Sequence, residues 1–450
     1  MMPPIYPKSY LIDSRQFWEI IFSGFWTCHA LTFALKQRRH AREQGDVEHE
    51  VLAWRLAGLL PVVLFHKTHG KNGVPMPTLH KRFEDFTQGR WTVLLQDALS
   101  SAVTGKRASA ADVSSAEHDN KRRAAAAERS VRLGEVSRAR QCLTGAALAP
   151  GTDETFRGLQ ERRPKESGEL GDDVRSFVPE APLALDRDLF TDALRSSSKG
   201  SSPGPGGCTY ELLRVLLDAS DAHDEVFYAA QDLARAAVPC EVAEAYTQAR
   251  LTALRKQDSG VRGIATGTTL RRLVAKTLAR QFGGEVEAAC APRQFALSTR
   301  AGTDCVGHAV RALTDARPTA TLVSVDGVGA FDNVSRKAML SKLLSFPGAR
   351  AMLPFVLLSY GQESSCDWKD AEGEVARWSK GKVVNKATHS CRFSSAWGCM
   401  SRFRKLAQGS TMANSSSHTW TTSILSSSQN ACALCVTTWP KLCSDAQGYA

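Results

Sequence analysis

The final part of the chain has almost no acidic residues. Between Gly381 and Ala450, 70 positions include a single acid, Asp445, together with 20 serines and threonines and five of the chain's twelve cysteines. No helical or strand period persists through this stretch. This composition excludes an ordinary folded domain over these positions.

Signals for export or for crossing a membrane are also lacking. The cysteines outside this last stretch are dispersed, as in reducing intracellular proteins. The apolar run over 17–35 begins too late for a secretory signal and has no small-residue cleavage site. It contains Glu19 and His29, which are costly in hydrocarbon. We therefore expect an intracellular protein, in the nucleus or the cytoplasm, without a membrane span.

Positive charge is what the chain has in excess. Its 450 residues carry a net charge of +11, and 43% of them are hydrophobic. This length predicts two or three domains with a core. The excess of cations fits a polyanionic partner and would attract nucleic acid without regard to sequence.

One acidic residue stands at a position suited to chemistry. Residues 321–325 form an apolar, β-branched run that predicts a buried strand, and Asp326 follows at its C-terminal end. An acid at the end of a central strand can hold a divalent cation, although strands that end in Asp-Gly are common in α/β proteins. A haloacid-dehalogenase-type phosphatase would need a second Asp where Val328 stands.

The segment resembles motif A of the reverse transcriptases of non-LTR retrotransposons and group II introns. Asp326, Ala330, Phe331 and Asp332 fall on that family's pattern. The resemblance implies that Asp326 is catalytic and binds the Mg²⁺ ions. It also implies that Phe331 lies under the sugar of the incoming nucleotide and excludes a 2′-OH.

A basic segment upstream is similar to the fingers hairpin of the same family. It covers residues 251–264 and continues into 269–276. The resemblance implies that Lys256 and Arg262, with Arg255 as a further candidate, neutralise the triphosphate of the nucleotide.

Two further segments resemble the family and stand in its order. Residues 202–213 are similar to the Pro-Gly-Pro-Asp-Gly segment that opens the fingers, with Gly206 in place of the Asp. Residues 292–305 resemble the stretch between fingers and palm, with Ala296 as a departure. Four matches in order favour the resemblance more than any one of them does.

The family's motifs B and C do not occur in the chain as it is read. Read one frame over, the codons of 384–390 permit Glu-Gln-Gly-Asp-Pro-Leu, and those of 417–422 permit Ala-Tyr-Leu-Asp-Asp. Both lie where the family has these motifs and in one shifted frame. We infer a frame change between about Asp370 and Lys380. The frame change would also explain Cys432, Cys435 and Cys443 as accidents of the shifted frame, since a fourth zinc ligand is missing beside them.

The expected fold class is mixed α and β, written α/β (α+β). It is a truncated right-hand polymerase, with fingers and palm preceded by a helical connector. The expected parts are a helical, basic connector over 1–149, a polar linker over 150–182, fingers over 183–317, a partial palm with motif A over 318–375, and an out-of-frame, disordered tail over 376–450.

The resemblance implies RNA-templated DNA synthesis, in which a primer 3′-OH attacks a dNTP. The implied partners are an RNA template, a DNA primer and dNTP, with Mg²⁺ as cofactor. One carboxylate cannot organise two Mg²⁺ ions, so we expect the chain as written to be inactive. Two alternatives stay open: a non-catalytic, basic nucleic-acid-binding remnant, and an unrelated α/β protein attached to a membrane through residues 17–35. The sequence predicts no oligomeric state.

The frame change can be tested on the nucleotide sequence of the gene. Translating the codons from about residue 375 onward in the shifted frame should yield Gln-Gly-Asp-Pro followed by Tyr-x-Asp-Asp. Sequencing genomic and transcript nucleotides across this region is the measurement. If neither motif appears in any frame, the hypothesis is wrong.

Overall fold

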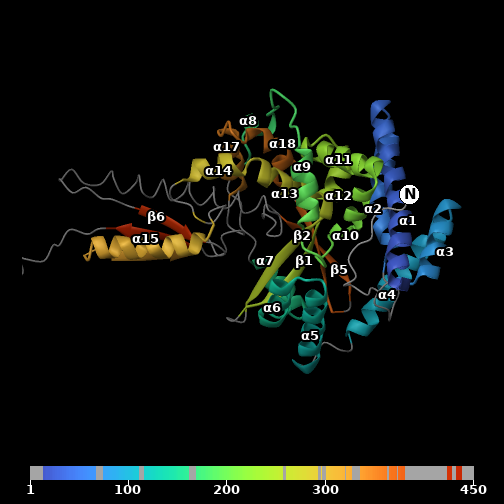
Figure 1. The fold of residues 1–450 in the computed structure, drawn as a ribbon, viewed down its shortest axis with the longest axis horizontal. Helices are drawn as coiled ribbons and strands as arrows, with labels where there is room; N and C mark the ends of the chain where they lie inside the picture. Colours follow the sequence, from blue (N-terminus) through green and yellow to red (C-terminus); the bar gives the residue numbers. More distant parts are fainter. Residues whose placement is uncertain are drawn as a thin grey trace, which may run out of the picture.

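The computed structural model describes residues 14–66, 74–110, 116–161, 169–256, 260–291, 295, 300–319, 321–326, 335–361, 364–371, 373–380, 423–427 and 432–437. Over these residues the protein is mostly helical, with a four-stranded sheet and a three-stranded sheet. The fold is therefore of the α+β class (Figure 1). The α+β class does not by itself distinguish a right-hand polymerase from other folds.

The N-terminal part is helical, as its sequence predicts. Asp46 begins the second helix by accepting a hydrogen bond from the His49 N–H at 3.1 Å, which satisfies one of the unpaired donors of the first turn. The helices of this part are α1 (Ser14–Glu43), α2 (Val47–Leu64), α3 (Met76–Thr87), α4 (Trp91–Ala110), α5 (Ala116–Arg132), α6 (Val136–Thr144), α7 (Asp153–Glu161) and α8 (Asp172–Arg175).

The middle of the chain adds helices around a β-hairpin. In chain order it contains α9 (Arg187–Arg195), α10 (Tyr210–Val215), the 3₁₀ turn η1 (Leu216–Asp218), α11 (Ser220–Ala234), α12 (Cys240–Thr247), β1 (Ala249–Arg255), β2 (Val261–Gly267), α13 (Thr269–Gln281), α14 (Gly283–Cys290) and α15 (Gly302–Ala316). The remaining elements are β3 (Thr321–Asp326), α17 (Arg336–Leu344), η2 (Arg350–Met352), α18 (Leu353–Tyr360), β4 (Ser364–Lys369), β5 (Val375–Lys380), β6 (Ser423–Ser427) and β7 (Cys432–Thr437).

One core joins the N-terminal helices to the middle of the chain. Trp54 on α2, Phe190 on α9 and Leu273 on α13 are all buried in it. Ion pairs line the contact between α1 and α11, where Arg39 contacts Glu225 at 2.8 Å and Lys36 contacts Asp221 at 2.9 Å. The N-terminal helices are thus packed onto the rest of the protein through both apolar and charged contacts.

The four-stranded sheet has the order β2-β1-β4-β5. Strands β1 and β2 form the antiparallel hairpin expected over 251–264, from Ala249 opposite Gly267 to Arg255 opposite Val261. Strand β4 lies parallel to the first half of β1. Residues 147–149 pair with the second half of β1, where the Ala149 N–H donates to the Ala253 carbonyl at 2.9 Å. Two segments far apart in the sequence thus share one edge of β1.

Helix α7 covers one face of this sheet. Leu159 on α7 is buried against Leu251, and Phe156 stacks on Trp368 with ring centroids 5.2 Å apart. These residues lie in the segment 150–182, for which the sequence predicts a polar linker. Two apolar side chains spaced three apart are enough to dock a short helix on an apolar sheet face.

The second sheet has the order β3-β7-β6, with all pairings antiparallel. Helix α15 lies along it, and this unit extends to the left of Figure 1. Strands β6 and β7 fall inside 376–450, for which the sequence predicts a disordered tail. Strand β7 supplies the neighbour that β3 needs for its backbone hydrogen bonds, and β6 pairs with the other edge of β7.

The loop before α10 approaches the end of the hairpin very closely. A Cβ added at Gly204 would lie 2.7 Å from the Thr268 Cα and still closer to the Gly267 carbonyl oxygen. Both neighbours are backbone atoms, which cannot rotate away. The glycine at 204 is therefore required for this contact.

Replacing Gly204 by Ala should lower the free energy of unfolding by about 2 kcal/mol, because the hairpin and the loop must move apart. Urea unfolding followed by circular dichroism measures this. Gly206→Ala, in the same loop, is the matched control, since its Cβ would meet only the Gly58 carbonyl at 3.5 Å. Equal effects of the two substitutions would contradict the close approach.

Candidate functional site

The basic residues of the β1–β2 hairpin lie on a defined face. Residues 249, 251 and 253 face α7 and are buried. Arg250 and Lys256 have the opposite parity, and Arg262 pairs with Leu254, which shares that parity. Arg250, Lys256 and Arg262 therefore lie on the face turned away from α7.

Arg255 does not share the face of the hairpin that carries Arg250, Lys256 and Arg262. Arg255 has the parity of the α7 face and is exposed at the end of β1. Lys256 directly follows β1, and its N–H donates to the Gly260 carbonyl at 2.7 Å. Arg262 is exposed, whereas Lys256 is half-buried. The two residues expected to contact the triphosphate thus share a face, and the third candidate does not.

The loop Pro203–Gly207 lies beside the other end of the hairpin, where β1 begins and β2 ends. The Arg250 guanidinium donates to the Gly204 carbonyl at 3.4 Å. Arg272 on α13 donates to the Ser202 carbonyl at 2.8 Å and lies over the Tyr210 ring. Two of the upstream segments singled out in the sequence are therefore neighbours in space.

Three cations of α13, namely Arg271, Arg272 and Lys276, are buried, which the sequence did not lead us to expect. Arg271 is 2% exposed and donates to the Thr247 carbonyl at 2.9 Å and the Ser359 carbonyl at 3.2 Å. Residues 269–284 contain no acid. This lack of carboxylates could have indicated that the cations of α13 have main-chain partners. Cations without nearby carboxylates are satisfied here by main-chain carbonyls, which is a structural role.

Lys276 is the most perturbed of these cations. Its Nζ donates to the Ala193 carbonyl at 2.9 Å and to the Ser197 hydroxyl at 3.1 Å, at the C-terminal end of α9. Burial, together with the charges of Arg280 and Arg214, lowers the pKa of Lys276 to about 8. The ammonium caps α9, where the helix dipole favours a cation.

Asp326 stands at the C-terminal end of β3, as the sequence predicts. Its partner across the sheet is Cys432 of β7. Neither β6 nor β7 contains a carboxylate, and a thiol is a poor ligand for Mg²⁺. These strands do not fit a two-magnesium site. Phe331 lies outside the described residues.

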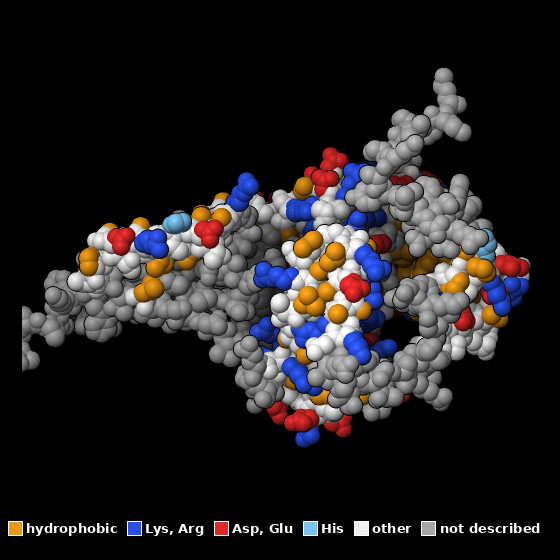
Figure 2. All heavy atoms as spheres, turned by 60° about the horizontal axis from the view of Figure 1, so that its bottom comes forward, with side chains coloured by type: hydrophobic (Ala, Val, Ile, Leu, Met, Phe, Trp, Pro, Cys, Tyr) orange, Lys and Arg blue, Asp and Glu red, His pale blue; other side chains and the backbone are white. Residues whose placement is uncertain are grey.

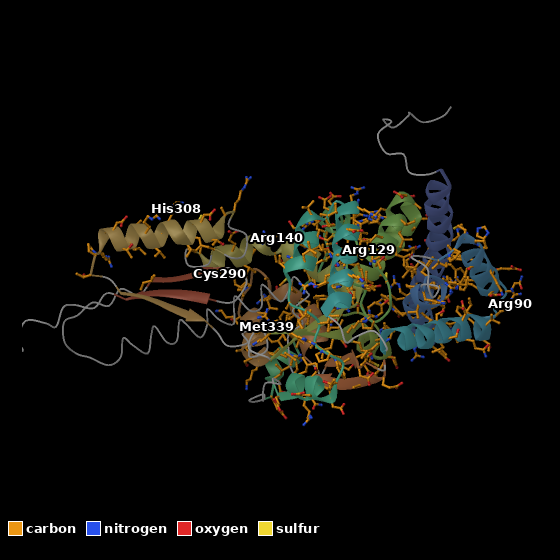
Figure 3. The ribbon with its side chains drawn as sticks, turned by 90° about the horizontal axis from the view of Figure 1, so that it is seen from below. Arg90, Arg129, Arg140, Cys290, His308 and Met339 are labelled. Atoms are coloured by element: carbon orange, nitrogen blue, oxygen red, sulfur yellow. The ribbon has the colours of Figure 1, made fainter. Side chains whose placement is uncertain are left out.

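The hairpin and Asp326 belong to different sheets. In Figures 1 and 3 the β3-β7-β6 sheet and α15 lie at one end of the long axis, while β1 and β2 lie nearer the middle. The structure therefore brings Lys256 and Arg262 together but does not bring Asp326 to them. In the described part of the chain, no group of three or more His, Cys, Asp or Glu side chains could hold a metal ion.

Comparison with known proteins adds no family. The chain matches no family model and no curated protein. Among the helices that the structure describes, none combines the length and hydropathy needed to cross a membrane.

The burial of Lys276 predicts a pH dependence of stability. Because its pKa is about 8 in the folded protein and 10.5 is its ordinary value, the unfolded chain binds more protons between these two pH values. The free energy of unfolding therefore rises with pH across this window, as the cost of burying the charge is lost. Urea unfolding at several pH values between 8 and 10.5 measures this rise.

Lys276→Met should remove this part of the rise. Lys342→Met, on α17, is the matched control and should keep the profile of the unsubstituted protein. A Lys276→Met variant with an unchanged profile would show that Lys276 does not titrate in this window.

Proposed function

We propose that this chain is a reverse-transcriptase-like protein that binds nucleic acid through its β1–β2 hairpin and does not itself carry out synthesis. The observation that carries the proposal is the cationic face of that hairpin. It comes after the glycine-rich loop and before α13, in the order that the family resemblance predicts. By that resemblance, the ancestral activity is RNA-templated DNA synthesis from dNTPs.

The chemistry of the hairpin supports binding to phosphates. The guanidinium of Arg262 is exposed and presents its donors in a fork that fits phosphate oxygens. Lys256 adds a point charge on the same face. The backbone hydrogen bonds of β1 and β2 hold both residues in place, so little further ordering is needed on binding.

The absence of synthesis is proposed from the surroundings of Asp326. Transfer of a nucleotide to a primer requires two Mg²⁺ ions held by at least two carboxylates on adjoining strands. The residues of β6 and β7 supply none. Without those ligands the reacting oxygens have no metal to stabilise them, and binding is the function left to this chain.

Binding is tested with the full chain and a single-stranded RNA oligonucleotide, by fluorescence anisotropy at several salt concentrations. The double variant Lys256→Gln/Arg262→Gln should bind several-fold more weakly. Its plot of log affinity against log salt should be shallower by about 1.4, since each lost phosphate contact removes about 0.7. Lys342→Gln/Arg175→Gln removes the same charge, one lysine and one arginine, from exposed sites elsewhere and is the control. An equal loss in both variants would show that only net charge matters.

Synthesis is tested by primer extension on an RNA template with dNTPs and Mg²⁺. We expect no extended primer from the chain as written. Extension that disappears in Asp326→Ala would overturn the proposal that the chain is inactive, and would show that the carboxylates are supplied from residues outside the described strands.

A further inference from the structure

Helices α5 and α6 form a basic hairpin at the bottom of Figure 1. Between residues 120 and 150 there are seven cationic side chains and two acidic ones. This face comes forward in Figure 2, where Lys and Arg side chains surround exposed apolar ones. Glu117 and Asp119, at the start of α5, add two more acids, so positive charge outweighs negative charge over the two helices by three.

The arginines of α5 follow one stripe of the helix. Arg122, Arg129 and Arg132 are exposed and stand at positions i, i+7 and i+10, which share a face. Arg140 is exposed on the neighbouring helix, and Figure 3 shows Arg129 and Arg140 from below on these two helices. The only acid on this part of α5, Glu128, lies 3.9 Å from Arg132, so it offsets one charge weakly.

Other basic residues of the α5–α6 hairpin have structural roles. Arg123 donates to the Cys142, Leu143 and Gly145 carbonyls at the end of α6, at 2.6–3.0 Å. Arg138 donates to the Lys199 carbonyl at 3.1 Å. These contacts hold the hairpin together, whereas the side chains of Arg129, Arg132 and Arg140 are exposed.

The α5–α6 hairpin is fixed at two points, one on the loop before α10 and one on β1. Its connecting turn contacts the loop before α10, where the Lys199 N–H donates to Glu135 at 2.7 Å. Beyond α6, the Ala147 carbonyl accepts from the Arg255 N–H at 2.8 Å. The stripe is therefore held in a set position beside the strand that ends at Lys256.

We propose that the exposed arginines of α5 and α6 bind the phosphodiester backbone of nucleic acid, as a second surface that extends the one at Lys256 and Arg262. The class of partner rests on the function proposed above, but the surface does not share residues with it. Arginine forks suit phosphate oxygens, and backbone contacts need no base sequence.

Exposed apolar residues on the same helices raise the question of another occupant. Val131, Val136 and Leu143 are 56%, 68% and 55% exposed, and basic helices with apolar side chains also bind anionic lipid. Figure 2 shows apolar side chains in the middle of this face with cations around them, so binding to lipid vesicles is measured in the test below. Contact with the adjoining β1–β2 hairpin favours the nucleic-acid backbone.

The test uses the full chain with Arg129→Gln/Arg132→Gln/Arg140→Gln. Binding to a single-stranded RNA, to DNA of the same sequence and to vesicles of phosphatidylserine and phosphatidylcholine is measured in parallel. RNA binding should weaken about tenfold, with a salt slope shallower by about 2, since three contacts are lost. DNA binding that weakens equally would show that the backbone charge alone is read. Lysine at the three positions should keep most of the affinity.

The control removes the same charge at Arg300, Arg311 and Arg317, which are exposed around α15, and should change RNA binding much less. Circular dichroism and a urea midpoint show that each variant is folded. Equal losses in the control, or loss of vesicle binding alone, would overturn the inference. A loss only in Lys256→Gln/Arg262→Gln would overturn it while leaving the proposed function intact. A loss only in the α5–α6 variant would support this surface and count against the hairpin.

Discussion

The packing of this protein depends on buried cations that are paired with main-chain carbonyls instead of carboxylates. Arg271 reaches the ends of α12 and α18, Arg272 reaches the loop before α10, and Lys276 reaches the end of α9. All three project from α13. These hydrogen bonds offset part of the cost of removing a charge from water, so this one helix is tied to four other segments. The exposed cations of the β1–β2 hairpin face solvent on that framework.

The division of the cations into buried and exposed ones determines how the net charge acts on a ligand. The cations with main-chain partners inside the protein contribute to folding and are not accessible to a ligand. Arg262 on β2, and Arg129 and Arg140 on α5 and α6, are exposed and can act on a polyanion. The net charge of +11 therefore does not give the charge that a ligand meets, which depends on which cations are exposed.

Much of the fold could be predicted from local patterns, and the rest depended on distant partners. The sequence predicted a helical N-terminal part, and the resemblance to the fingers hairpin of the reverse transcriptases predicted the hairpin of β1 and β2. The docking of α7 was missed because Phe156 and Leu159 are only two apolar side chains in a polar stretch. The pairing of β3 with β7 was also missed, because a strand sequence does not specify its neighbour. For the site, parity within β1 separates Lys256 from Arg255, but nothing local places Asp326 relative to either.

The shared edge of β1 has a consequence for how the chain can be divided. Its first half is covered by β4 and its second half by residues 147–149, which come from opposite sides of the hairpin in sequence. A shorter chain beginning at residue 183 would keep the hairpin but leave the Ala253 carbonyl and the Arg255 N–H without their partners. An open strand edge of this kind pairs readily with other chains. Residues 147–149 thus protect this edge of β1 as well as joining it to the α5–α6 hairpin, and residues 183–317 taken alone would lack that cover.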